Sequence, residues 1–187
     1  MSGLPERKKR LRRNCFANLK VMTAEEKASS SNKICKTIAQ LPEFQAARTV
    51  FAFLPLPSEP DLCPLFDESR IWGFARVLPD QSMEFREVKD FSDTIEGEFK
   101  IREPDPDKCP VLPPESADLL IIPGVGFCKT TGNRLGRGKG HYDRYLERLR
   151  RLEKPPVLIG VCFSVQLCDV EAEVHDIPMD KVITDGK

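Results

Sequence analysis

A buried strand, a glycine-rich loop and an amphipathic helix follow one another in residues 118–148, and this order limits the possible folds more than any other feature of the chain. The run from Leu119 to Ile122 is short, unbroken and rich in branched side chains, which is typical of a strand buried on both faces of a sheet. After His141, apolar residues recur at helical spacing with charged residues between them. These residues are Tyr142, Tyr145, Leu146 and Leu149. The sequence therefore predicts a strand–loop–helix unit.

The loop of this unit combines glycines with cations. Glycine recurs so often between residues 132 and 140 that the backbone entropy cost is high unless a ligand approaches the main chain closely. Phosphate is the usual ligand, because the unbonded N–H groups and the positive dipole at a helix start attract anions. Arg134, Arg137 and Lys139 alternate with the glycines and can offer guanidinium and ammonium groups to a polyphosphate. Asp143 follows at the start of the helix, where a carboxylate beside a polyphosphate indicates Mg²⁺.

A purely structural role is the alternative for this loop. Glycine-rich segments before helices are often only tight turns, and the loop matches neither common nucleotide motif. It lacks the Gly-Lys-Ser/Thr ending of the P-loop and the Gly-x-Gly-x-x-Gly spacing of the dinucleotide turn. Its position directly after a buried strand, with cations and an acid among the glycines, favours a phosphate site without identifying the ligand.

Two segments carry a family resemblance. The first is Pro123-Gly-Val-Gly-Phe, and the second is Gly132-Asn-Arg-Leu-Gly-Arg-Gly-Lys-Gly-His-Tyr-Asp-Arg-Tyr-Leu. Together they resemble the motifs of the 5-formyltetrahydrofolate cyclo-ligase family, whose enzyme is also called methenyltetrahydrofolate synthetase. The resemblance extends over nearly the whole chain, from the basic segment at Lys8 to the closing residues 176–184. It implies a Rossmann-like three-layer α/β/α sandwich with a mostly parallel sheet, which agrees with the alternation of predicted strands and helices.

Length and composition favour one globular domain spanning residues 1–187. The 187 residues are 40% hydrophobic and carry a formal net charge of zero, which argues against a general nucleic-acid or membrane surface. No apolar run approaches the length of a transmembrane helix, and the N-terminus is charged where a signal peptide needs an apolar core. The 7 cysteines include no Cys-x-x-Cys pair, so reduced thiols fit better than a disulfide framework or a zinc site. We expect a cytoplasmic monomer with no nucleic-acid or membrane partner.

An amphipathic helix is predicted over residues 5–22, where apolar residues recur at helical intervals beside a run of cations. From charge alone, three interpretations compete: a solvated face, a nuclear-localisation or nucleic-acid patch, or phosphate ligands that fold back onto the glycine loop. Charge alone favours the solvated face, because charge runs usually face water. The resemblance implies the third, because the family contacts ATP through a Lys-x-x-x-Arg pair on its first helix, which Lys8 and Arg12 match. One helical turn separates these two residues, so both can point at one triphosphate.

The turn after the first predicted strand is a second candidate site. Residues 49–54 have the pattern of a buried strand that leads into a proline-rich turn, and α/β proteins place ligand groups after such strand ends. Judged by residue type alone, Glu59 in this turn is a surface carboxylate. The family resemblance implies instead that Glu59 and Leu54 contact the folate. Trp72, in a strand predicted over residues 71–78, either lines the folate pocket or fills the core, which its large area favours.

The remaining segments complete an α/β pattern. A capping box at Thr23 to Glu26 starts a second helix that stops at Pro42, and further strands are predicted over residues 83–88, 157–163 and 182–184. The proline-rich residues 101–114 are predicted to be an extended connection with neither regular structure nor a site.

Acids in the C-terminal tail complete the implied site. On composition alone they are solvated loop charges. The resemblance implies that Asp176 joins Asp143 in holding magnesium, with oxygen ligands and waters as Mg²⁺ prefers. His175, which precedes Asp176, is predicted to be structural or a surface residue rather than a catalyst.

The resemblance also implies the reaction and its residues. ATP phosphorylates the formyl oxygen of 5-formyltetrahydrofolate, N10 attacks the iminium phosphate, and 5,10-methenyltetrahydrofolate forms with release of ADP and phosphate. The predicted catalytic residues are Arg137, Lys139 and Glu59, which align the reactants and neutralise charge. The predicted ATP-binding residues are Lys8, Arg12, Arg134, Gly136, Arg137, Gly138, Lys139, Gly140, His141 and Tyr142. The predicted folate-binding residues are Leu54, Glu59, Arg137, Gly138, Lys139, Gly140 and His141. The predicted Mg²⁺ ligands are Asp143 and Asp176.

Two features of the loop depart from the pattern of many relatives. Many members have an aromatic residue where this chain has His141, and imidazole can still stack or donate a hydrogen bond there. Many bacterial members have uncharged residues at the positions of Arg137 and Lys139. A second class of function therefore stays open, a nucleotide-binding regulatory protein that keeps the loop without ring closure.

Overall fold

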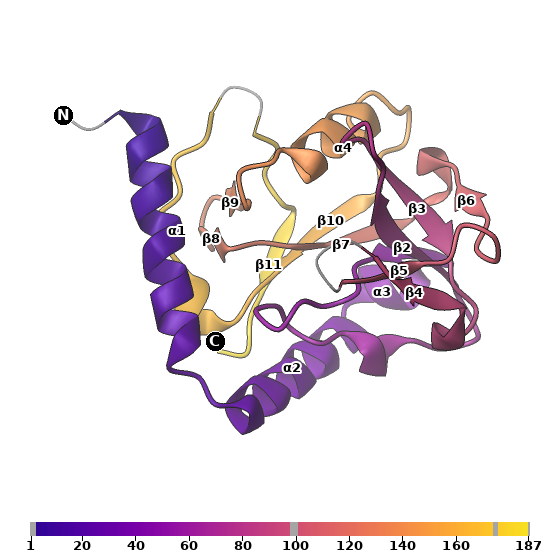
Figure 1. Cartoon of the computed structure of the whole chain (residues 1–187), viewed down its shortest axis with the longest axis horizontal. Coiled ribbons are helices and arrows are strands. Elements are labelled where there is room, and N and C mark those ends of the chain that lie inside the picture. The colour runs from indigo at the N-terminus through magenta and orange to yellow at the C-terminus, as the bar shows by residue number, and fades with distance from the viewer. Residues whose placement is uncertain (1–2, 98–100, 174–175, 187) are drawn as a thin grey trace.

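The computed structural model describes residues 3–97, 101–173 and 176–186, and its centre is a 7-stranded sheet (Figure 1). The strand order is β11-β10-β7-β1-β2-β3-β6. Neighbours from β11 to β2 pair in parallel, whereas β3 is antiparallel to both β2 and β6. The strands are β1 (Thr49–Ala52), β2 (Ile71–Val77), β3 (Met83–Glu87), β6 (Val111–Leu112), β7 (Leu119–Pro123), β10 (Val157–Val161) and β11 (Lys181–Ile183).

Helices cover both faces of this sheet. The helices are α1 (Leu4–Lys20), α2 (Ala24–Ala39), α3 (Pro42–Ala46) and α4 (His141–Leu149). Ile34 and Ile38 of α2 and Phe44 of α3 pack on one face of the sheet, while Tyr145 and Leu146 of α4 pack on the other. The predicted three-layer α/β/α sandwich with a mostly parallel sheet is confirmed.

The capping box predicted at Thr23 is present and begins α2. The Thr23 hydroxyl accepts a hydrogen bond from the Glu26 amide at 3.1 Å, and the Glu26 carboxylate accepts one from the Thr23 amide at 2.8 Å. The helix ends at Ala39, before Pro42 as predicted. Pro42 has a second role that the prediction missed, because it stands at the first position of α3, where its missing N–H costs no hydrogen bond.

Helix α1 stands beside the sandwich, next to a small hairpin of β8 (Gly126–Phe127) and β9 (Arg134–Leu135) (Figure 1). Cys15 is buried there in a cluster with Val125 and Leu135. Residues 128–133 form the tip of this hairpin, where the Cys128 amide donates to the Asn133 carbonyl at 2.9 Å. None of the helices within the described residues is long and apolar enough to span a membrane.

The chain adds neighbouring strands to both sides of β1. After β1 the chain adds β2 on one side, and β7 later joins on the other side. The carboxyl ends of β1 and β7 therefore lie side by side, and ligands of α/β proteins bind in the crevice at such a switch point. Phe53 and Leu54 follow β1, Pro123 ends β7 and Gly124 follows it, so these residues border the crevice.

The prediction for residues 101–114 is wrong. Residues Arg102–Pro104 form β5, which pairs with β4 (Thr94–Glu96), and Val111–Leu112 form β6 at the edge of the main sheet. Proline is compatible with these short edge strands because its missing N–H can face away from the ladder. Trp72 is 2% exposed and packs against Phe44 and Phe74, so the core interpretation is confirmed.

Candidate active site

Two cavities adjoin at the glycine loop, residues 132–140. The apolar pocket, about 190 Å³ in volume, lies at the switch point and is walled by Phe53, Leu54, Ala75, Val77, Met83 and Tyr142. The polar pocket, about 240 Å³, lies between the loop, α1 and the C-terminal tail and is walled by Lys8, Arg12, Gly138, Glu173 and Asp176. Arg134, Gly136, Gly140 and Asp143 line both cavities. Ligands bound in the two pockets would therefore both contact this short segment.

The main chain of the loop requires glycine at two points. Gly138 has φ +97° and Gly140 has φ +71°, a left-handed backbone that other residues adopt only with strain. Gly140 is also the N-cap of α4, so the loop ends directly at a helix N-terminus. Two arginines fix the main chain of the loop: Arg12 donates to the Gly136 carbonyl at 2.8 Å, and Arg144 donates to the Lys139 carbonyl at 3.1 Å. The loop is thus held in place by side chains from α1 and α4.

Cations in the polar pocket face carboxylates. The Lys8 Nζ atom lies 2.9 Å from Asp176 Oδ2 and 3.4 Å from Glu173 Oε1, and the Lys8 side chain is only 12% exposed. Arg134 lies 2.5 Å from Asp143, and its side chain is 7% exposed. Lys8 is therefore not part of a solvated face, whereas Lys9 and Arg10 of the same helix are exposed.

This arrangement suits a ligand that itself carries charges of both signs. Asp143 and Asp176 would repel a bare polyphosphate. If the polyphosphate carries a divalent cation, its oxygens can pair with the two basic side chains while the cation pairs with the two carboxylates. Within the part of the chain that the structure describes, no cluster of three or more His, Cys, Asp or Glu side chains could hold a metal ion. Two carboxylates, completed by phosphate oxygens and water, are a donor set that Mg²⁺ accepts and that structural zinc does not.

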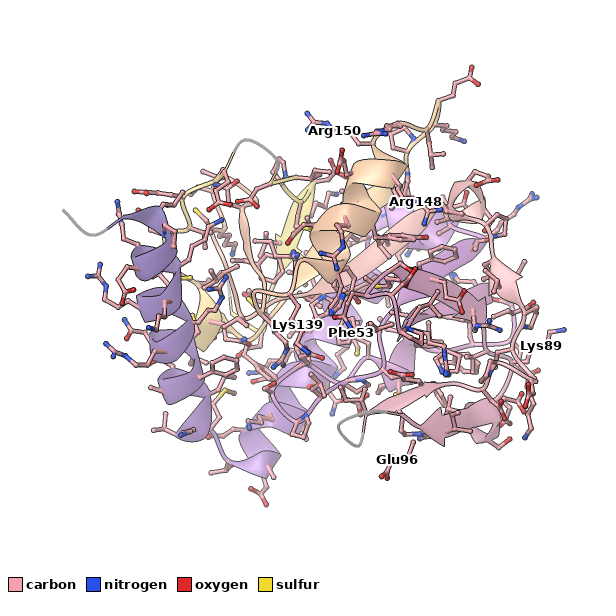
Figure 2. The ribbon with its side chains drawn as sticks, turned by 45° about the horizontal axis from the view of Figure 1, so that its top comes forward. Phe53, Lys89, Glu96, Lys139, Arg148 and Arg150 are labelled. Carbon is pink, nitrogen blue, oxygen red and sulfur yellow. The ribbon has the colours of Figure 1, made fainter. Side chains whose placement is uncertain are left out.

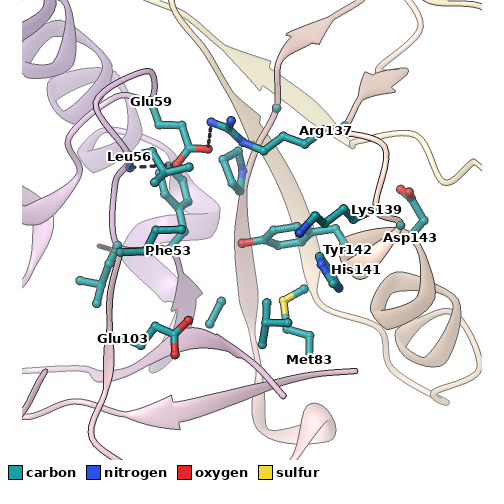
Figure 3. A pocket seen from close by; sticks show the side chains of 18 of the residues that line it. Phe53, Leu56, Glu59, Met83, Glu103, Arg137, Lys139, His141, Tyr142 and Asp143 are labelled. Carbon is teal, nitrogen blue, oxygen red and sulfur yellow. Dashed lines mark hydrogen bonds and ion pairs between the residues drawn. The ribbon is translucent and has the colours of Figure 1, made fainter. Parts of the chain in front are cut away.

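A salt bridge spans the mouth of the apolar pocket from one loop to the other (Figure 3). Arg137 of the glycine loop lies 3.1 Å from Glu59 and donates to the Ser58 hydroxyl at 2.7 Å. The other oxygen of Glu59 accepts from the Leu56 amide at 3.1 Å. The Glu59 side chain is 7% exposed, so the carboxylate that residue type places at the surface is instead largely shielded from water and held by Arg137.

The inner wall of the apolar pocket is aromatic, and Lys139 reaches the same space. Phe53 and Lys139 are distant in sequence, yet both line the apolar pocket, and both are labelled near the centre of Figure 2. Figure 3 shows the Tyr142 ring beside Lys139 and across from Phe53. Burial, reinforced by the nearby Glu59 carboxylate, raises the pKa of Tyr142 far above its ordinary value, so its hydroxyl stays protonated.

The structure distributes the predicted residues over the two pockets. Of the predicted folate ligands, Leu54, Glu59, Arg137, Lys139, Gly140 and His141 line the apolar pocket, and Gly138 lines the polar one. Of the predicted ATP ligands, the polar pocket is lined by Lys8, Arg12, Arg134, Gly136, Gly138 and Gly140. Four others, Arg137, Lys139, His141 and Tyr142, line the apolar pocket alone. The predicted magnesium ligands Asp143 and Asp176 both line the polar pocket, and His175 lies outside the described residues.

The sequence did not predict some of the residues that line the two pockets. Ile101, Arg102 and Glu103 line the apolar pocket, although this segment was predicted to hold no site. A run of prolines and charges gives no sign that a segment returns to a cavity. Glu173 lines the polar pocket, and its only sequence signal was its place among the tail acids near Asp176.

The fold and this pair of pockets define an α/β protein with a ligand site at the switch point of its sheet and a phosphate-type glycine loop beside it. Residues 5–185 match the model of the 5-formyltetrahydrofolate cyclo-ligase family. The chain belongs to this family and is therefore an enzyme of the ligase class.

Individual relatives agree over almost the full length. The chain is 30% identical over 175 residues to the 5-formyltetrahydrofolate cyclo-ligase of Escherichia coli K12, covering 90% of this chain and 94% of that protein. It is 26% identical over 194 residues to the enzyme of that name from Mus musculus, covering 94% and 92%.

Solved structures give the same assignment. The NMR structure of Aquifex aeolicus 5,10-methenyltetrahydrofolate synthetase superposes with a TM-score of 0.81 at 29% identity, covering 96% of this chain and 90% of that one. The Mycoplasma pneumoniae 5,10-methenyltetrahydrofolate synthetase gives 0.76 at 26% identity, covering 96% and 99%. Family and structures together support 5,10-methenyltetrahydrofolate synthetase activity, the conversion of 5-formyltetrahydrofolate to the methenyl form.

Proposed function

We propose that the chain, as a single domain spanning residues 1–187 and a cytoplasmic monomer, cyclises 5-formyltetrahydrofolate to 5,10-methenyltetrahydrofolate at the expense of ATP, with Mg²⁺ and with release of ADP and phosphate. One observation carries the proposal: Arg134, Gly136, Gly140 and Asp143 line both pockets. A triphosphate in the polar pocket and a folate in the apolar pocket would therefore meet at the glycine loop, as phosphoryl transfer between them requires.

The chemistry needs a phosphoryl group on the formyl oxygen. That oxygen is a poor leaving group, so the γ-phosphoryl group of ATP is first transferred to it, which breaks the bond between the β,γ-bridging oxygen and the γ-phosphorus and gives an iminium phosphate. N10 of the folate then attacks the formyl carbon, the C–O bond to phosphate breaks, and the five-membered ring closes with loss of the N10 proton. No protein nucleophile is needed, and the work of the protein is alignment and neutralisation of charge.

The residues of the glycine loop fit this work. Arg12 and Lys8 of α1 would hold the triphosphate from the side of the polar pocket, and the helix N-terminus at Gly140 would add the N–H groups of the first turn of α4. Lys139 enters the apolar pocket, where its ammonium would neutralise the phosphoryl group as it reaches the formyl oxygen. Arg137 would add its guanidinium from the same side, held in place by Glu59.

Asp143 and Asp176 would hold Mg²⁺ in the polar pocket. Bound there, the ion would supply charge neutralisation for the triphosphate oxygens. In exchange, Arg134 and Lys8 would be released from these carboxylates to contact phosphate. The paired cations and acids of the polar pocket would thus become two separate sets of ligands.

The direct test is the near-ultraviolet absorbance of the methenyl product. Purified protein with Mg-ATP and 5-formyltetrahydrofolate is expected to produce this absorbance together with one ADP per product. The competing hypothesis is a nucleotide-binding regulatory protein without ring closure. Binding of ATP with no development of absorbance would reject the proposed function and favour that alternative.

A second prediction concerns Arg12. Replacing Arg12 by alanine removes the bond to the Gly136 carbonyl and one proposed phosphate ligand, so the KM for ATP is expected to rise about 10- to 100-fold. The KM for 5-formyltetrahydrofolate is expected to stay within about 3-fold, because Arg12 does not line the apolar pocket. Arg13→Ala is the matched control, since Arg13 is the next residue of α1 and is exposed. If Arg12→Ala and Arg13→Ala have equal KM values for ATP, Arg12 is not part of the nucleotide site.

A further inference from the structure

The turn between β2 and β3 lies beside the start of α4, and the proposed mechanism does not use it (Figure 1). Residues 78–82 form this turn, and Val77 and Met83 on either side of it line the apolar pocket. The Gln81 amide donates to the Leu78 carbonyl at 2.9 Å. Gln81 has φ +67°, a left-handed backbone that is uncommon for residues other than glycine. The fold therefore holds this turn in a conformation that has a cost.

Two side chains at the start of α4 bind the Gln81 carbonyl of this turn. Arg144 Nη2 donates to the carbonyl oxygen at 2.8 Å, and His141 Nδ1 lies 3.0 Å from it. A carbonyl oxygen can only accept, so the imidazole donates from Nδ1 in this contact. The turn that borders the apolar pocket is therefore tied to the helix that follows the glycine loop.

The guanidinium of Arg144 also binds the glycine loop. Arg144 Nη1 donates to the Lys139 carbonyl at 3.1 Å, so one planar group joins two main-chain carbonyls from different parts of the chain. This group lies against Gly140, where a Cβ atom would stand 2.9 Å from Nη1. Glycine at position 140 thus leaves room for Arg144 in addition to allowing the left-handed backbone. The result is a direct link between Lys139 and the β2–β3 turn.

The attachment of α4 to the sheet does not depend on Arg144. Tyr145 and Leu146 are 3% and 1% exposed and anchor the helix in the core. The Tyr145 ring also packs against Phe85 of β3, with ring centroids 4.9 Å apart. Arg144 itself is exposed. Loss of its guanidinium should therefore leave the helix in place and free the Lys139 main chain to move relative to the pocket wall.

We propose that Arg144 is a positioning residue that keeps the Lys139 ammonium aligned with the β2–β3 wall of the apolar pocket. The inference rests on the proposed function, in which Lys139 neutralises the phosphoryl group as it reaches a folate bound in that pocket. Phosphoryl transfer depends on alignment of the donor and acceptor oxygens with the groups that neutralise them. Loss of Arg144 should therefore slow the chemical step more than it weakens the binding of either substrate.

Arg144→Met tests this role, because it keeps an unbranched apolar side chain and removes the guanidinium. We expect kcat to fall about 10- to 30-fold, while the KM values for ATP and 5-formyltetrahydrofolate stay within about 3-fold and the Tm changes little. Arg148→Met is the matched control. Arg148 is exposed one turn further along α4, and its guanidinium lies over the Tyr145 ring, so this variant should behave as wild type.

A double-mutant cycle with Lys139→Met separates positioning from a general structural effect. If Arg144 acts through Lys139, adding Arg144→Met to Lys139→Met should lower kcat by less than about 3-fold more. Independent structural damage would instead multiply the two losses. With an active wild-type enzyme, multiplied losses would overturn the inference, and so would an Arg144→Met variant whose kcat equals that of Arg148→Met.

Hydrogen exchange of the backbone amides examines the same contacts without turnover. Residues 78–82 and 136–141 should exchange faster in Arg144→Met than in Arg148→Met, because both segments lose a bond to the guanidinium. Equal exchange in the two variants would overturn the inference. A wild-type protein that forms no methenyl product would reject the proposed function, and the exchange comparison would still decide whether Arg144 joins the loop to the turn.

Discussion

Replacing Lys139 by methionine is expected to lower kcat by about 100- to 1,000-fold, the range found when a single charge-stabilising donor is removed from an active site. Methionine keeps most of the length and the apolar character of the side chain and removes the ammonium. The change should appear in kcat more than in either KM, because the charge that Lys139 neutralises is greatest while the phosphoryl group moves between the two substrates.

The position of Lys139 is the reason for this size of effect. Its flanking glycines both have a left-handed backbone, and Arg144 binds its carbonyl, so the main chain at this residue is fixed. The side chain reaches the apolar pocket, whereas the neighbouring Gly138 lines the polar pocket and Gly140 lines both. Lys139 is exposed in the free protein and places its cation on the folate side, beside the segment that lines both pockets. Substrates bound there would exclude water and strengthen the field of its ammonium.

Lys129→Met is the control for this prediction. Lys129 is exposed at the tip of the β8–β9 hairpin and lines neither pocket, so its replacement should leave all kinetic constants within about 2-fold. Single-turnover measurements with saturating substrates separate the chemical step from product release. If Lys139→Met turns over at the rate of Lys129→Met, the ammonium has no part in phosphoryl transfer and the mechanism proposed for the loop is wrong.

The elements with strong local patterns could be predicted from the sequence. The apolar run at 119–122 became β7, the periodic residues after His141 became α4, and the capping box began α2. Each depends on neighbours within one or two turns of chain, which is the range over which propensity and periodicity act. The β4–β5 hairpin was missed because proline and charge in residues 101–114 resemble a loop, and only contact with β2 makes this segment a wall.

The residues of the candidate site also fall into a group that local sequence predicts and a group that it does not. The glycine loop could be interpreted as a phosphate site because glycines, cations and a helix start stand together within a few residues. The pair of Glu59 and Arg137 joins residues 78 apart, and Lys8 meets Asp176 across 168 positions. Nothing in a single sequence measures such separations, so Glu59, Lys8 and Asp176 were selected through the family resemblance, whereas Arg137 was selected from the loop itself. Glu103, which lines the apolar pocket, had neither support and was not selected.

Replacing Asp143 by asparagine is expected to raise the free Mg²⁺ concentration required for half-maximal activity at least about 10-fold and to lower kcat by about 100-fold. Asparagine has the same shape and can still accept the hydrogen bond of Arg134, so the local structure should persist. What is lost is one of two carboxylates in the polar pocket, and with it the exchange in which Mg²⁺ takes the acids while the cations take phosphate.

A structural role for Asp143 gives a different result, and this makes the prediction decisive. If Asp143 only pairs with Arg134, Asp143→Asn should leave both the Mg²⁺ dependence and the increase in Tm that Mg-ATP gives to the protein unchanged. If it also holds the ion, this increase in Tm should shrink by the loss of linked binding energy. Glu147→Gln, on the exposed side of the same helix, is the control, because Glu147 pairs only at the surface with Arg151 in the part of the chain that the structure describes. An unchanged Mg²⁺ requirement together with an unchanged Mg-ATP shift in Tm would exclude Asp143 as a metal ligand and leave the paired charges of the polar pocket as a purely structural feature.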